Sequence, residues 1–485
     1  MDRNAHQMLI AFNRETKKLD DVYRSAAKSC GISECAFWIL YTLRVEEKSF
    51  TQAEICEFLI EPKQTVNSAL KKLEAEGYLY TREKRGYYVA DVERHLAAPG
   101  RAPARSAPQP QRSWLLDLSS GGSGTEDFPF SVWAKLMRRV LSEEGEALLR
   151  ATPPNGADAL RRAIAQHLYR FRGISAAPEQ IVVGAGTEYL YNLIVQLLGR
   201  EAVYGVEDPG YSKAARIYAL GGARTAPVLV DEGGVSLRSL EMSGAQILHT
   251  SPNHQFPTGA VTPIGRRQSL LRWAEAREGR YIIEDDYDSE FRFTLRPIPT
   301  LQSIDRAGRV IYVNTFSRTL APSLRISYMV LPKGLTERYR AQLGFYSSTV
   351  PAMEQHTLAR FLDEGYFEAH INRMRKSYRA QRDAVIDTIL QSPLGEHCRV
   401  SGEDAGLHFL LTIDTKCTDH VLRADAEGRG VRLSFLSDFA LRPGSAPQHT
   451  LVIHYPGIDL GRLRSALSIL EALLYFRDWK YKGRK

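Results

Sequence analysis

Hydrophobic residues recur at helical spacing through the first seventy-five positions of the chain. Apolar side chains three or four residues apart predict a first helix over Ala5–Ser29, and the spacing resumes after Gly31. Ser33 is a suitable N-cap for a second helix, and Thr51, with a glutamate three residues later, predicts a capped helix to about residue 59. A fourth helix is predicted over 63–77. Two short runs, 78–81 and 86–89, then predict a hairpin around a basic tip.

The predicted fourth helix has one apolar and one polar face. Val66, Leu70 and Leu73 fall on the inward side. Helix, turn, polar-faced helix and basic hairpin, in this order, are typical of a winged helix-turn-helix, whose second helix reads base edges in a major groove. A solvated helix beside a surface hairpin is the plainer alternative. The predicted DNA contacts are Lys63, Gln64, Thr65, Asn67, Ser68 and Lys71 on the helix, and Arg82, Lys84 and Arg85 on the hairpin.

This segment resembles two kinds of winged helix. Its long leading helix and its Gln64–Asn67 stretch are similar to MarR-type domains, whereas its hairpin is similar to GntR-type wings. The Leu-Pro-Ser-x-Arg sequence that GntR-type domains have before the recognition helix is missing, so the subfamily stays open. We predict this DNA-binding domain over 1–92. A linker rich in proline, alanine and arginine follows over 93–114, because such composition cannot form a core.

From residue 115 onward, short apolar runs alternate with amphipathic helices. Strands are predicted over 180–183, 202–205, 246–249, 281–284 and 310–313. The alternation predicts an α/β fold with a doubly wound sheet, in which ligands bind at the carboxyl ends of the strands. A long helical stretch over 354–390 and apolar runs at 406–411 and 449–454 predict a small C-terminal α+β subdomain, about 350–476, within a domain spanning 115–485.

Polar residues follow the predicted strands. A glycine-rich turn, 184–188, opens an apolar helix and is suited to holding a phosphate, although a tight turn needs glycine in any case. Tyr211, after the second run, can stack on a planar ring. The carboxylate of Asp285 can pair with a protonated ring nitrogen. An ordinary solvated turn is the alternative for each of these segments.

The stretch 313–330 has the most specific pattern. Thr315 and Ser317 end a strand, a cation follows at Arg318, and a second cation lies seven residues later at Arg325. Hydroxyl groups, backbone N–H groups and a guanidinium can together hold a phosphate. The stretch resembles the cofactor segment of fold-type I pyridoxal-phosphate enzymes, Ser/Thr-x-x-Lys with an arginine seven residues on. Arg318 stands at the lysine position, and a guanidinium, whose pKa is above ~12, offers no free amine for a Schiff base.

The order and spacing of all these motifs resemble those of MocR/GabR-type regulators, which join a winged helix to an aminotransferase-like domain. The resemblance spans the whole chain. It implies pyridoxal 5'-phosphate as cofactor, bound without a covalent link or lost, with Asp285 at the ring nitrogen, Tyr287 at the ring hydroxyl and Tyr211 at the ring. It also implies phosphate contacts from Gly186, Thr187, Thr315 and Arg325, with Arg318 beside them. For an arginine that grips an effector's carboxylate, Arg432, Arg442 and also Lys213 stay open.

Composition adds two expectations. The net charge of +8 suits a polyanionic partner such as double-stranded DNA, and the five cysteines lack any metal-binding spacing, so no metal site is predicted. Without a signal peptide or a membrane-spanning run, we expect a cytoplasmic protein that does not enter a membrane.

Three functions remain at this point. The first is a homodimeric transcriptional regulator that binds operator DNA and senses a small molecule, such as an amine or amino acid. An active aminotransferase and a cofactor-free dimerisation scaffold are the alternatives. Arg318 argues against the aminotransferase, because transamination needs a lysine to form the Schiff base and to move protons.

Overall fold

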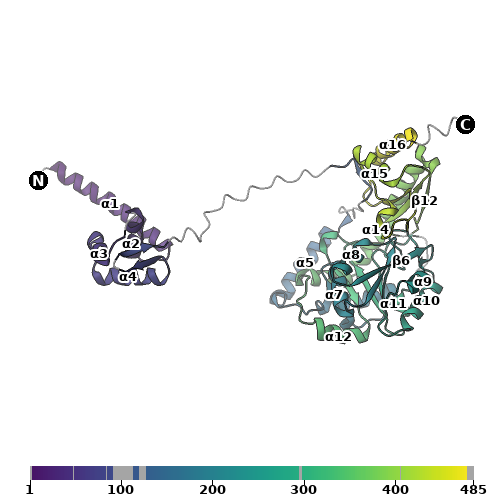
Figure 1. The fold of residues 1–485 in the computed structure, drawn as a ribbon, viewed down its shortest axis with the longest axis horizontal. Coiled ribbons are helices and arrows are strands. Elements are labelled where there is room, and N and C mark those ends of the chain that lie inside the picture. Colours follow the sequence, from purple (N-terminus) through teal and green to yellow (C-terminus); the bar gives the residue numbers. More distant parts are fainter. Residues whose placement is uncertain are drawn as a thin grey trace. The chain divides into compact units, whose positions relative to one another are not determined.

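The computed structural model describes residues 3–46, 49–83, 85–90, 113–119, 127–293, 298–404 and 406–477. The chain divides into two compact units, Met1–Gln111 and Arg112–Lys485 (Figure 1). The predicted wing residue Lys84, most of the predicted linker and the basic C-terminal tail lie outside the described residues.

The first unit contains four helices and a two-stranded hairpin within its described part. Thr51 forms the predicted capping box with Glu54, whose carboxylate accepts from the Thr51 backbone N–H at 2.7 Å. Side chains from the second, third and fourth helices pack into one core with Phe50, which also bridges to Tyr87 of the hairpin. The elements are α1 (Arg3–Ser29), α2 (Glu34–Val45), α3 (Gln52–Leu59), α4 (Lys63–Ala75), β1 (Leu79–Arg82) and β2 (Gly86–Val89).

An eight-stranded sheet forms the centre of the second unit, with strand order β4-β11-β10-β9-β8-β5-β6-β7. All five predicted strands are present. β11 runs antiparallel to both of its neighbours, so β4 still points the same way as the parallel strands. The strands are β4 (Ile181–Gly184), β5 (Val203–Asp208), β6 (Arg224–Asp231), β7 (Gly234–Val235), β8 (Ile247–Thr250), β9 (Tyr281–Asp285), β10 (Val310–Thr315) and β11 (Ser327–Val330).

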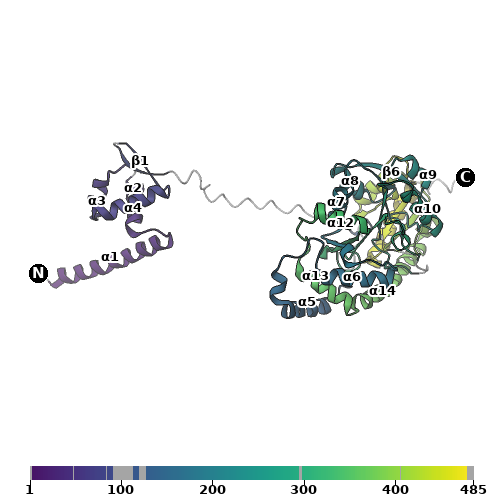
Figure 2. The same cartoon turned by 90° about the horizontal axis from the view of Figure 1, so that it is seen from below.

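Helices cover both faces of this sheet, which confirms the predicted α/β fold class (Figure 2). Alternate strand residues enter different cores: Val182 and Ile311 face α7, α8 and α12, whereas Ile181 and Tyr312 face α6, α13 and α14. The helices are α5 (Phe130–Glu144), α6 (Asp158–Arg172), α7 (Thr187–Leu198), α8 (Ser212–Leu220), α9 (Leu237–Met242), α10 (Ile264–Glu275), α11 (Leu301–Ile304), α12 (Lys333–Leu343), α13 (Ala352–Asp363) and α14 (Tyr366–Leu390).

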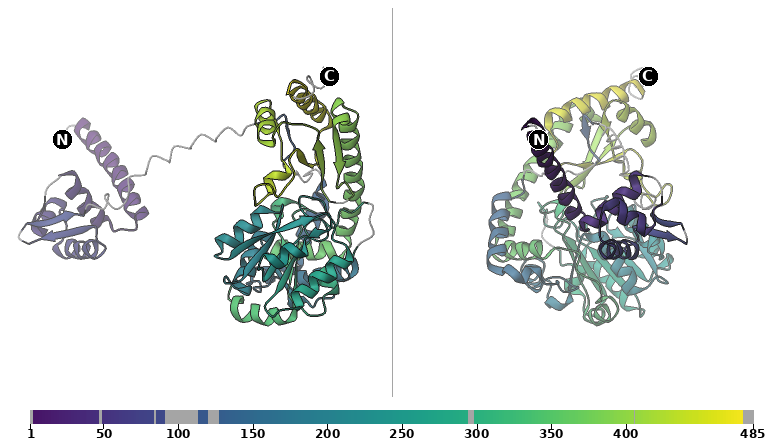
Figure 3. Two further views of the ribbon diagram at one scale, coloured as in Figure 1. Left: turned by 45° about the vertical axis from the view of Figure 1, so that its right-hand side comes forward. Right: turned by 90° about the vertical axis from the view of Figure 1, so that its left-hand side faces the viewer.

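The C-terminal part has its own three-stranded antiparallel sheet, order β12-β13-β15, and the long helix α14 runs beside both parts of the unit (Figure 3). The helical stretch predicted over 354–390 is present, as two helices. Gly365, in the left-handed conformation at φ 77°, separates α13 from α14. The remaining elements are β3 (Leu116–Asp117), β12 (Cys398–Ser401), β13 (His408–Ile413), α15 (Asp419–Gly428), β14 (Val431–Arg432), β15 (Thr450–His454) and α16 (Leu460–Arg477).

None of the helices in the described part of the chain has the length and hydrophobicity that a bilayer crossing requires.

Candidate functional site

A cavity of about 340 Å³ lies at the carboxyl edge of the large sheet. The ends of β9 and β10 and the N-terminal turn of α7 contribute to its wall, as expected for a sheet of this type. Of the eight predicted cofactor residues, seven line it, and the eighth, Gly186, lies against one of the seven. The lining residues are Thr187, Glu188, Tyr191, Tyr211, Lys213, Ser251, Phe256, Asp285, Tyr287, Thr315, Ser317, Arg318, Pro322 and Arg325.

One end of the cavity is built from the glycine-rich turn before α7. Gly186 has φ 95° and caps the helix, and a β-carbon there would lie 2.2 Å from Nη2 of Arg325. Arg325 itself has a left-handed backbone, φ 49° and ψ 34°, and its guanidinium lies 3.8 Å from Glu188. A guanidinium beside the first-turn N–H groups of a helix is an arrangement suited to an oxyanion.

The hydroxyl groups of Thr315, the last residue of β10, and of Ser317 complete that end. Oγ1 of Thr315 accepts hydrogen bonds from the Ser327 hydroxyl at 2.8 Å and from the Ser317 backbone N–H at 3.1 Å. The Ser317 hydroxyl oxygen is buried and has no hydrogen-bond partner among the described residues. An unpaired buried hydroxyl is costly unless a ligand pairs with it, so this end fits a phosphate.

Asp285 lies deeper in the cavity and is held by two side chains that the sequence analysis missed. Tyr191 donates to its Oδ2 at 2.6 Å, and Nε2 of His249 lies 3.4 Å from the same oxygen. The other ring nitrogen of His249 is hydrogen-bonded to Tyr218 at 2.6 Å. Oδ1 of Asp285 is buried without a partner in the described part of the structure, so it is available to a protonated ring nitrogen.

A group of aromatic and imidazole side chains lies beside Asp285. The Tyr287 hydroxyl lies 3.1 Å from Nδ1 of His254, which is also 2.9 Å from Asp288. Burial raises the pKa of Tyr287 well above its ordinary value, so the phenol stays protonated. Ligand atoms of His254, Asp288 and His408 lie within 4.8 Å of one another, and such residue types can also bind a metal ion.

Arg318 lines the cavity at the position where the resemblance implies a lysine. Lys213 also lines it, but its ammonium donates to Glu188 at 2.7 Å, and this hydrogen bond raises the pKa of Lys213. A protonated amine is not a nucleophile. The cavity therefore presents no free amine among its lining residues.

The two arginines left open as carboxylate ligands are both paired with acidic side chains. Arg432 lies 3.3 Å from Asp117, and Arg442 lies 3.1 Å from the fully buried Asp208. Neither lines the cavity.

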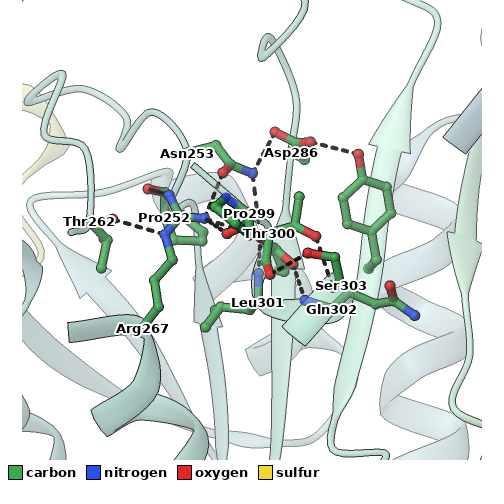
Figure 4. Close-up of polar contacts among 12 residues, drawn as sticks. Pro252, Asn253, Thr262, Arg267, Asp286, Pro299, Thr300, Leu301, Gln302 and Ser303 are labelled. Atoms are coloured by element: carbon green, nitrogen blue, oxygen red, sulfur yellow. Dashed lines mark hydrogen bonds and ion pairs between the residues drawn. The ribbon is translucent and has the colours of Figure 1, made fainter. Parts of the chain in front are cut away.

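A buried polar network holds the loop after β8 next to the end of β9 (Figure 4). Nδ2 of Asn253 donates to Asp286 at 2.9 Å, and Asp286 also accepts from Arg172 at 2.5 Å. Burial raises the pKa of Asp286, but the Arg172 charge together with hydrogen bonds from Tyr312 and Asn253 outweighs burial, so the pKa is lowered. The guanidinium of the fully buried Arg267 donates to four acceptors: the carbonyls of Thr262 (2.8 Å), Pro252 (2.8 Å) and Pro299 (3.0 Å), and Oδ1 of Asn253 (2.8 Å).

In the first unit, α4 presents a polar face. Val66, Leu70 and Leu73 are buried as predicted, and the predicted contact residues of the helix are exposed, except Asn67, which is half-buried. On the hairpin, Arg82 lies over the rings of Tyr80 and Tyr88, at 5.6 and 5.1 Å from their centroids. Arg85 is exposed beside it.

Comparison with known proteins places these features in a family. The aminotransferase class I and II family matches residues 115–422. An uncharacterized HTH-type transcriptional regulator, YdeL of Bacillus subtilis (strain 168), is 36% identical over 412 residues, covering 84% of this chain and 88% of YdeL. The probable rhizopine catabolism regulatory protein MocR of Rhizobium meliloti is 34% identical over 429 residues, covering 84% and 86%.

Solved structures agree on the second unit. The α-aminoadipate aminotransferase LysN of Thermus thermophilus, complexed with N-(5'-phosphopyridoxyl)-L-leucine, has a TM-score of 0.64 and is 26% identical, covering 74% of this chain and 92% of that chain. The chain therefore belongs to the MocR/GabR-type HTH transcriptional regulators, in which a winged helix-turn-helix precedes an aminotransferase class I and II domain.

Proposed function

We propose that this DNA-binding regulator holds pyridoxal 5'-phosphate in the cavity without a covalent bond, and that a small-molecule effector acts through that cavity. The observation that carries the proposal is a pair of unsatisfied buried oxygens in one cavity. Oδ1 of Asp285 and Oγ of Ser317 both lack partners among the described residues. A ligand with a protonated ring nitrogen and a phosphate satisfies both.

The chain's own residues take the following roles in this proposal. The turn at Gly186 and Thr187, with Thr315 and Arg325, binds the phosphate. Asp285 pairs with the ring nitrogen, and Tyr191 and His249 hold its carboxylate in place. Tyr287 binds the ring hydroxyl and Tyr211 stacks on the ring. The cofactor, when bound, supplies an electron-withdrawing pyridinium ring.

Arg318 disfavours the active aminotransferase. Its guanidinium stays protonated and cannot form the covalent link, and the one lysine lining the cavity is engaged by Glu188. We propose a role in sensing, in which a small molecule such as an amine or amino acid binds two states of the domain with different affinity.

The winged helix supplies the output. The exposed side chains of α4 from Lys63 to Lys71 would read base edges, and Arg82 and Arg85 would contact phosphates. Two such units in a homodimer would bind two half-sites, whose spacing the assembly sets.

Two measurements on the purified chain test this function. The first is operator binding by mobility shift at several salt concentrations, where phosphate contacts predict affinity that falls steeply with salt. The second is titration with pyridoxal 5'-phosphate, followed by borohydride reduction and mass spectrometry. We expect saturable binding with no added cofactor mass at the cavity. Covalent trapping on a cavity residue, or operator binding without sequence preference, would refute the corresponding half of the proposal.

A further inference from the structure

Of the three cationic side chains that line the cavity, two are paired with a described carboxylate and Arg318 is not. Glu188 is shared by Lys213 at 2.7 Å and Arg325 at 3.8 Å, and Asp285 is held by the Tyr191 hydroxyl. Arg318 forms no hydrogen bond or ion pair with any described residue. A cation on a cavity wall without a carboxylate partner is an attachment point for a ligand acceptor.

Two imidazoles on which the Arg318 charge acts are uncharged at neutral pH. Burial first, and the Arg318 charge second, lower the pKa of His454 to about 4, so its imidazole is neutral at neutral pH. Burial also keeps the pKa of His408 well below its ordinary value, with Arg318 contributing. The remaining carboxylate of this group, Asp288, is hydrogen-bonded to His254 at 2.9 Å. The two neutral imidazoles neither offset the Arg318 charge nor add to it.

We propose that Arg318 makes the cavity select among phosphorylated pyridine ligands by the group that each one places against this residue. A hydrogen-bond acceptor or an anion is favoured, as in an aldehyde, an alcohol or a carboxylate, and an ammonium group is rejected. This inference rests on the proposed function, because it assumes that the phosphate end binds at Gly186 and Arg325. According to this inference, the substituent next to Arg318 determines which ligands the cavity binds.

Pyridoxine 5'-phosphate and pyridoxamine 5'-phosphate provide a matched pair of probes. They differ only in a hydroxyl against an ammonium group, and neither can form an imine with surface lysines. Two like charges a few ångströms apart repel, and they do so more strongly near a protein surface than in water. We therefore expect the amine to bind at least about tenfold more weakly in calorimetric titrations at low salt.

Two variants of the full chain distinguish the effect of Arg318 on ligand selection from the effect of the phosphate end on affinity. Arg318→Met removes the charge while keeping an unbranched side chain, and we expect the ratio of the two affinities to shrink to within about threefold. Arg325→Met is the control, because it removes the proposed phosphate contact. We expect both affinities to fall and their ratio to persist. Thermal unfolding of each variant checks that the fold is kept.

The outcomes distinguish the inference from the proposed function. Equal or tighter binding of the amine by the native chain, or a ratio that survives Arg318→Met, would refute the selective role of Arg318 alone. Failure of both probes to bind, in a preparation that still shifts its operator, would overturn the inference together with the cofactor half of the proposed function.

Discussion

Replacing Arg267 by methionine tests whether the buried network organises the cavity edge. The side chain is fully buried, and its guanidinium makes four hydrogen bonds, three of them to backbone carbonyls. Burial lowers the pKa of Arg267 to about 10, which still leaves it charged at neutral pH. Methionine fills part of the same volume but donates to none of these acceptors.

The size of the destabilisation follows from the four hydrogen-bond acceptors that lose their donor. Each hydrogen bond to a charged donor contributes ~1.5–3 kcal/mol, and a buried acceptor without a partner costs ~1–3 kcal/mol. Loss of the nearby Glu284–Arg267 attraction, at 4.0 Å, adds to this, while removal of a buried charge offsets part of it. We expect the free energy of unfolding to fall by about 3–5 kcal/mol, among the largest effects of a single substitution.

Arg266→Met is the matched control one residue away. Its guanidinium pairs with Asp231 at the surface, where such ion pairs contribute ~0–1 kcal/mol. Urea unfolding of both variants, followed by circular dichroism and intrinsic fluorescence, gives the comparison, because the first unit is unchanged in each. A loss below about 1 kcal/mol for Arg267→Met, or one no larger than the control's, would refute the reasoning.

Three further predictions concern individual side chains. Burial raises the pKa of Glu284 from 4.5 to about 7. Its stabilising contribution is therefore complete below pH 4.5 and is lost as pH rises through 7. Glu284→Gln should make the free energy of unfolding, measured with urea, less dependent on pH over this range. Arg318→Lys should give a yellow adduct with pyridoxal 5'-phosphate that borohydride fixes at position 318, and a colourless variant would indicate a site unable to accept the cofactor. Gln64→Ala should reduce discrimination between operator and random DNA while the slope of log affinity against log salt concentration stays the same. Arg82→Ala should lower that slope by about one. Identical behaviour of the two variants in mobility shifts would contradict this division of roles.

The sequence supports much of this fold because its short signals are local. The capping box at Thr51 and the hairpin after α4 depend on residues within a few positions of one another. The five predicted strands of the large sheet, β4, β5, β8, β9 and β10, are largely apolar runs, which is typical of strands buried on both faces. β6 escaped prediction because its burial is only partial along most of its length. The break at Gly365 was also missed, because helical spacing continues on both sides of it.

The cavity residues also fall into those that lie in local sequence motifs and those that only tertiary packing brings to the cavity. Asp285 and Arg325 lie in recognisable motifs at strand ends, so the sequence points to them. Tyr191 and His249 reach Asp285 only through tertiary packing, and one is hidden in an apolar helix and the other in an apolar strand. His454, whose pKa the Arg318 charge lowers, lies on a strand of the C-terminal sheet that no local signal connects to the cavity.

The left-handed backbone of Arg325 means that its side chain and its backbone have opposite effects: the guanidinium serves the proposed phosphate site, whereas the backbone conformation costs stability. Left-handed geometry costs a non-glycine residue of order 1 kcal/mol, and glycine adopts it freely. A change to glycine at this position would therefore remove the guanidinium that we propose binds the phosphate, while relieving the backbone strain of this residue.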